Sequence, residues 1–171
     1  MAATFLMKVF TGTTAGTMNP AAAGDATNWN LMGIDSYDST GTAYQSNVIT
    51  VPPTGTSYSY ERWVKARFDG TFNKIDNIKV WKSAGTLSDV NLTLNAGTTA
   101  SGATPTNSVS SVATSTIPVT EGTAIDITPT SDITTSEDMS DFLVLQLVVP
   151  STVDTPGDIG TQTLTFQYDE Q

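Results

Sequence analysis

The sequence predicts an all-β protein, an antiparallel β-sandwich of the jelly-roll type, and three observations lead to this prediction. Threonine, serine and glycine dominate the composition, and the apolar spacing of an amphipathic helix is nearly absent. Short apolar or alternating segments recur along the chain, separated by Gly, Pro and Asn residues. A length of 171 residues suits one domain, so a single sandwich is expected over residues 1–171.

Nine segments are expected to form strands, because they combine β-branched and aromatic residues with turn residues at their ends. They are Thr4–Phe10, Asn47–Val51, Ser57–Phe68, Asn77–Trp81, Val90–Asn95, Ser115–Val119, Ala124–Ile127, Asp141–Val149 and Thr161–Tyr168. Turn-rich connections of this kind are typical of antiparallel sheets and not of an α/β fold.

Two of these strands alternate clearly between apolar and polar residues, which indicates one buried and one exposed face. In the third segment the predicted inner face is Tyr58, Tyr60, Val64, Ala66 and Phe68, and the outer face is Ser59, Glu61, Lys65 and Arg67. Arg62 interrupts the inner face and Trp63 the outer one. In the last segment Leu164, Phe166 and Tyr168 alternate with polar residues, as in a half-exposed strand.

The segment Phe142–Val149 is apolar on both sides, so it is expected at the centre of a sheet and covered on both faces. A short buried helix is the alternative, and the ending Val148-Val149-Pro150 argues against it. Helix signals amount to a single turn. Ser136 fits an N-cap, followed by acidic residues in the first turn.

Two regions rich in small residues do not fit a strand pattern. Residues 1–25 are expected to form an extended arm, or a strand plus a loop over Thr11–Asp25, and Ala96–Ala113 a long surface loop. Ordering such segments costs roughly 1–2 kcal/mol of backbone entropy per residue. We therefore expect neighbouring subunits or a larger particle to hold them in place.

The charge distribution argues against several functions. The net charge is −10, and residues 83–171 contain no lysine or arginine, so the chain offers no surface for a phosphate backbone. Histidine and cysteine are absent, which excludes a disulfide scaffold, a His-based triad and the commonest zinc ligands. No apolar run approaches the roughly 20 residues of a membrane span, and no secretion signal is recognisable at the N-terminus. We expect no enzyme activity, no cofactor, no metal, no nucleic acid and no membrane contact.

Two acidic clusters are candidate cation sites. Asp35 and Asp38 lie in a turn that resembles a calcium loop, but the spacing of an EF-hand is missing, and a solvated Asx turn is the favoured interpretation. Glu137, Asp138 and Asp141 form a second group, and capping of a helical turn accounts for the first two without a metal. A pair of carboxylates for glycoside hydrolysis stays open, because nothing in the sequence singles one out.

The tryptophans and the cations each allow two interpretations. Trp29, Trp63 and Trp81 could stack on sugar rings if exposed, although burial at a sheet corner is commoner. The cations Lys65, Arg67, Lys79 and Lys82 are expected to pair with acids on neighbouring strands. The alternative for them is an acidic surface on another protein.

The stretch from Tyr60 to Gly85, YERWVKARFDGTFNKIDNIKVWKSAG, resembles small auxiliary virion proteins of tailed bacteriophages, and the ending Leu164–Glu170 adds to the similarity. This resemblance implies a β-sandwich or jelly-roll protein that decorates or cements a head shell, often as a trimer. It implies as partners the major capsid protein and further copies of the chain, on the capsid surface of a virion assembled in the host cytoplasm. A phage tail, receptor-binding or carbohydrate-binding module is the alternative.

Overall fold

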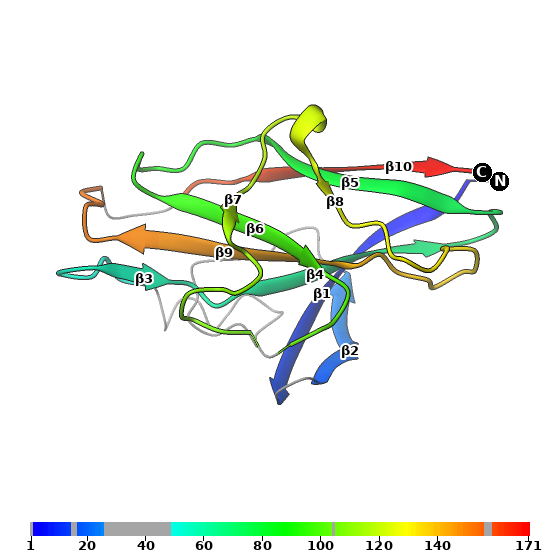
Figure 1. Ribbon diagram of the computed structural model, residues 1–171, viewed down its shortest axis with the longest axis horizontal. Helices are drawn as coiled ribbons and strands as arrows, with labels where there is room; N and C mark the ends of the chain where they lie inside the picture. Colours follow the sequence, from blue (N-terminus) through cyan, green and yellow to red (C-terminus); the bar gives the residue numbers. More distant parts are fainter. Residues whose placement is uncertain (1, 15–16, 26–48, 104, 156–158) are drawn as a thin grey trace.

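The structure, a computed structural model, describes residues 2–14, 17–25, 49–103, 105–155 and 159–171. Within these ranges the chain forms two antiparallel β-sheets and one short 3-10 helix, η2 (Glu121–Thr123), and no α-helix (Figure 1). The predicted all-β sandwich is confirmed. The jelly-roll connectivity stays a prediction.

The larger sheet has seven strands and the smaller sheet three. Neighbours in the larger sheet follow the order β2 (Thr17–Asp25), β1 (Thr4–Thr14), β4 (Arg62–Asp69), β9 (Phe142–Pro150), β6 (Thr93–Thr99) and β7 (Ser115–Thr116), and β3 (Thr56–Tyr58) also pairs with β9. The smaller sheet has the order β10 (Thr163–Glu170), β5 (Ile75–Ala84) and β8 (Ile125–Asp126). All of these pairings are antiparallel.

Strand β9 lies between β4 and β6 and is buried on both faces, as its sequence predicted. Leu143, Leu145 and Leu147 belong to the main core between the sheets. Phe142 and Val144 alternate with them and form a second, smaller cluster with Trp63. The outer face of the large sheet is therefore also covered, by residues that belong to neither of the two sheets.

An aromatic cluster joins the two layers near the chain ends. The ring of Phe5 on β1 lies 5.9 Å from Phe68 of β4 and 5.3 Å from Phe166 of β10, measured between centroids. Phe68 in turn meets Tyr168 edge to face at 4.9 Å. The backbone N–H of Ala3 donates to the carboxylate of Glu170, which places the two termini side by side (Figure 1).

The expected N-terminal arm is replaced by a hairpin. Residues Thr4–Phe10 pair with β4 at every position, which confirms the first predicted strand. The loop expected over Thr11–Asp25 is wrong, because β1 continues to Thr14 and Thr17–Asp25 returns beside it as β2. Threonine favours the extended backbone, and the ladder satisfies its hydrogen bonds. Removing residues 1–25 would therefore remove two strands of the sheet, β1 and β2.

Several strand boundaries differ from the prediction. Residues 49–51 form no strand, and 47–48 lie outside the described residues. Val90 is exposed in a turn, so the next strand begins only at Thr93. The expected helical turn after Ser136 is a tight turn, in which Glu137 has a φ of 78° and cannot continue a helix.

A β-bulge divides the predicted strand Ser57–Phe68 in two. Tyr58 lies opposite Val148 and Arg62 opposite Leu145, so one strand has one residue more than the other between these pairs. The extra residue reverses the side-chain alternation. Tyr58 therefore lies on the outer side together with Val148, and its predicted inner position is wrong. After the bulge, the predicted inner positions of Val64, Ala66 and Phe68 are correct, because all three belong to the main core.

Candidate interaction surface

The connection between β6 and β7 covers the outer face of the large sheet. We call its described part, residues 100–103 and 105–114, the β6–β7 loop. Ala113 of this loop is buried in the cluster of Trp63, Phe142 and Val144. Pro105 and Ser110 are also buried, whereas Asn107, Ser108 and Val109 are exposed. The loop therefore has an inner side that packs and a tip that faces outward.

The carboxyl group of Glu61 anchors the loop from the sheet side. Glu61 is the last residue of the bulge and is only 3% exposed. One carboxylate oxygen accepts hydrogen bonds from the indole N–H of Trp63 at 3.0 Å and the backbone N–H of Thr106 at 3.3 Å. The other accepts from the hydroxyl of Ser110. Two of these three donors belong to the loop, so the buried carboxyl group is satisfied only when the loop is closed over it.

Gln146 anchors the loop at a second point. This residue lies on the outer face of β9 and is 1% exposed. Its amide nitrogen donates to the carbonyls of Ser59 at 3.0 Å and Ser108 at 2.8 Å. Its amide oxygen accepts from the backbone N–H of Ser110 at 3.2 Å. The side-chain amide of Gln146 thus supplies the hydrogen bonds that a neighbouring strand would otherwise give to the loop backbone.

Ser110 joins the two anchors inside the loop. Its hydroxyl oxygen accepts hydrogen bonds from the backbone N–H groups of Val112 at 3.0 Å and Ala113 at 2.7 Å, while its proton goes to Glu61. Removal of this hydroxyl would leave buried N–H groups without an acceptor, and each such loss costs about 1–3 kcal/mol.

Gly97 makes the close approach of the loop possible. It lies on β6 opposite Val144, and a Cβ built on it would lie 1.9 Å from the carbonyl oxygen of Val112 and 2.7 Å from the carbonyl carbon. Real Cβ atoms do not approach backbone atoms so closely, so only glycine fits this position.

The segment predicted as the long surface loop, Ala96–Ala113, is therefore placed differently from expectation in two respects. Its first residues, Ala96–Thr99, belong to β6. The rest is held by side chains of its own chain, Glu61 and Gln146, whereas the composition suggested that a neighbouring subunit or a shell would be required.

Trp63 and Lys65 extend this covered face. Trp63 is 1% exposed and meets Phe142 edge to face at 5.3 Å, so it cannot stack on a sugar. The ammonium group of Lys65 lies 4.2 Å from the centroid of the Phe142 ring. Burial lowers the pKa of Lys65, and the charge of Asp141 opposes this effect.

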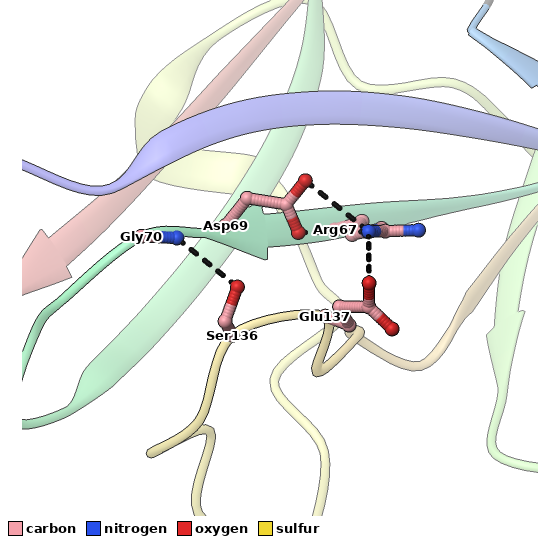
Figure 2. A network of polar contacts seen from close by, with 5 residues as sticks. All are labelled: Arg67, Asp69, Gly70, Ser136 and Glu137. Atoms are coloured by element: carbon pink, nitrogen blue, oxygen red, sulfur yellow. Dashed lines mark hydrogen bonds and ion pairs between the residues drawn. The ribbon is translucent and has the colours of Figure 1, made fainter.

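The acidic group expected after Ser136 serves to fix a turn. Figure 2 shows the guanidinium group of Arg67 between the carboxylates of Asp69 and Glu137, at 2.8 Å and 3.0 Å. The hydroxyl of Ser136 accepts from the backbone N–H of Gly70 at 3.2 Å (Figure 2). Asp138 accepts from the backbone N–H groups of residues 134 and 135, which lower its pKa against the effect of burial. The partner Glu137 is exposed, and an ion pair with an exposed partner contributes at most about 1 kcal/mol.

The other tryptophans, cations and acidic residues of interest are distributed over the molecule. Trp81 is half-buried on β5, and Lys82 donates to the carbonyl of Gly85 at 3.0 Å. Lys74 pairs with Asp76 and Asp132, two acids that raise its pKa through hydrogen bonds. Trp29 and the Asp35/Asp38 turn lie outside the described residues.

The described residues contain no group of three or more Asp, Glu, His or Cys side chains arranged to hold a metal ion. Glu137, Asp138 and Asp141 are not brought together as a cation site there. In the same part of the chain, no helix has both the length and the apolar character required to cross a bilayer.

Away from the β6–β7 loop, the carboxylate of Asp89 joins its own loop to the loop that follows β9. Its carboxylate accepts hydrogen bonds from the backbone N–H of Asn91 at 2.7 Å, and from those of Asp154 and Thr155 at 3.1 Å and 3.2 Å. The adjacent Val90 is 98% exposed. These hydrogen bonds, led by that of Asn91, hold the pKa of Asp89 at about 2.

Comparison of the chain with models of protein families, with curated proteins and with solved structures found no match.

The first prediction concerns Gly97. Gly97→Ala should lower the free energy of unfolding by about 1–3 kcal/mol, because β6 and the loop must separate to admit the methyl group. Chemical denaturation measures the change. Gly122→Ala is the matched control, since a Cβ at Gly122 meets no atom within 4 Å, and it should change stability by less than about 0.5 kcal/mol. Equal effects of the two substitutions would contradict the close approach.

The second prediction concerns acid stability. Because the pKa of Asp89 is lower in the folded chain than in the unfolded one, its carboxylate stabilises the fold above about pH 4, and this contribution disappears as the pH falls towards 2. Asp89→Asn should lower the melting temperature at pH 7 and flatten its decline between pH 4 and 2. Glu121→Gln makes the same charge change at an exposed residue, and its melting temperature should decline with pH as steeply as that of the wild type. An unchanged slope in Asp89→Asn would refute this role.

Proposed function

We propose that this chain is a non-enzymatic structural virion protein that binds a bacteriophage capsid shell and stabilises it. The observation that carries the proposal is the geometry of the β6–β7 loop. The buried side chains of Glu61 and Gln146 hold this loop against the sheet, and its tip faces outward. In this buried polar network, the two anchoring side chains bond to backbone, to Ser110 and to Trp63. These hydrogen bonds give a rigid contact surface and not a reactive group.

The resemblance to auxiliary virion proteins supports the same proposal. The two stretches that carry it, Tyr60–Gly85 and Leu164–Glu170, contain β4, β5 and β10, of which β5 and β10 are paired. They therefore lie in the frame of the sandwich, and the loops supply the contacts. A fixed loop loses little conformational entropy on binding, and a shell multiplies modest contacts because many copies bind one lattice.

The partners in this proposal are the major capsid protein of the shell and further copies of this chain, at the capsid surface. Neither a nucleic acid nor a membrane takes part. Four cations have partners within the chain: Arg67 and Lys74 form ion pairs, Lys65 lies over the Phe142 ring, and Lys82 donates to the carbonyl of Gly85. This arrangement favours their structural role over a docking site for an acidic protein.

The third prediction tests attachment. Val109 is 68% exposed at the tip of the β6–β7 loop, and Val119 is 60% exposed on another connection. Val109→Glu should weaken binding to a shell about tenfold or more, because it places a charge in an apolar contact. Co-sedimentation with shells purified without this protein from the phage that encodes it measures the binding.

The matched control is Val119→Glu, which should bind as the wild type does. Binding of both variants at wild-type affinity would show that the loop tip is not the contact. A wild-type chain that leaves the shells unoccupied, with no gain in their thermal stability, would overturn the proposed function.

A further inference from the structure

Strand β10 forms a long, unprotected edge of the small sheet. It pairs with β5 on one side, and among the described residues no strand pairs with its other side. The remaining edge strands are protected differently. Strands β7 and β8 have two residues each, β3 has three, and β2 contains Pro20. Edges of natural sheets are usually short, charged or interrupted by proline, and β10 has eight residues.

The backbone groups at the open edge can be identified from the neighbouring strand. Ile78 of β5 directs its backbone towards β8, since its carbonyl accepts from Ile127 and its N–H donates to Thr128. Lys79 and Trp81 alternate with Ile78 and must point to β10, where they oppose Gln167 and Thr165. It follows that the N–H and C=O groups of the alternating residues, Leu164, Phe166 and Tyr168, point away from β5.

The side chains at this edge are incompletely covered. Leu164, Phe166 and Tyr168 contact the main core, yet each is only half-buried. Gln167, which alternates with them, has a buried side-chain oxygen that meets no hydrogen-bond donor within the described residues. Both features leave apolar area and a polar atom that one further strand would satisfy.

The charge pattern along the open edge of β10 favours a second acidic chain over a basic partner. The chain carries a net charge of −10, yet residues 159–168 include no Asp, Glu, Lys or Arg. A strongly basic partner would find no charge along this run, and a second acidic chain would meet no repulsion there. The acids Asp169 and Glu170 follow this run only at the end of β10.

We propose that β10 pairs antiparallel with β10 of a second copy of this chain, so that the two small sheets form one continuous sheet across a twofold axis. In the register that centres on Phe166, Leu164 lies opposite Tyr168 of the second copy, and each of these residues exchanges both backbone hydrogen bonds with its opposite residue. Asp169 then lies opposite Thr163 and Glu170 opposite Gln162, so no two acids face each other.

The same register supplies a donor for Gln167. Its opposite residue is Thr165 of the second copy, whose hydroxyl donates to Ser83 within the subunit at 2.7 Å and can rotate towards the amide. The twofold arrangement differs from the trimer implied by the resemblance, because a threefold ring would require β10 to pair with a different edge of each neighbour. The inference does not depend on attachment to a shell.

The first test is the mass of the full chain by sedimentation equilibrium over a range of concentrations. The wild type should dimerise, and Thr165→Lys should raise the dissociation constant about tenfold or more, because two lysines then lie diagonally across the junction. Thr116→Lys, the same substitution on exposed β7, is the matched control and should dimerise as the wild type does. Melting curves confirm that each variant is folded.

The second test reads the edge directly and needs no substitution. The amides of Leu164 and Phe166 should exchange rapidly in the dilute monomer and slowly in the concentrated dimer, whereas those of Thr165 and Gln167 should be protected in both. A monomer at all concentrations, a trimer, a dimer unaffected by Thr165→Lys, or edge protection that appears only with a different protein would each overturn the proposal.

Discussion

The hydrogen bonding of one buried carboxyl group, that of Glu61, determines how the outer face of this sandwich is built. A buried carboxyl group without partners destabilises a fold by several kcal/mol, and Glu61 finds its donors in Trp63, Thr106 and Ser110. The loop in turn obtains acceptors for its own backbone. The sheet and the loop therefore stabilise each other, and neither side of the contact is satisfied alone.

This mutual dependence explains two features of the chain that look unrelated. The β-bulge before β4 turns Glu61 and Trp63 towards the loop and away from the main core. Gly97 removes the side chain that would otherwise keep the loop off β6. With a regular strand in place of the bulge, or with any side chain at position 97, the small residues of the loop would have no surface to pack on.

The sequence was sufficient to predict the regular part of the fold. The apolar run of β9, the alternation in β10 and the turn residues between strands follow from local rules, and the structure has these elements. The bulge was not predicted, because one extra residue reverses alternation without changing composition. The pairing of Thr17–Asp25 and the anchors of the β6–β7 loop were also missed. The Thr17–Asp25 hairpin strand lacks the apolar alternation that marks a strand, and the loop anchors depend on contacts between residues far apart in the sequence, such as Gln146 with Ser110.

The measurement that tests the central claim most directly is amide hydrogen exchange of the loop in the wild type and in Gln146→Met. If the anchors hold the loop, the amides of Ser110 and Ala113 should exchange as slowly as those of β5 in the wild type. In the variant they should exchange roughly a hundredfold faster than in the wild type, the effect of losing about 3 kcal/mol of local stability, while β5 keeps its protection. Rapid exchange of these amides in the wild type, or equal protection in both proteins, would contradict the account.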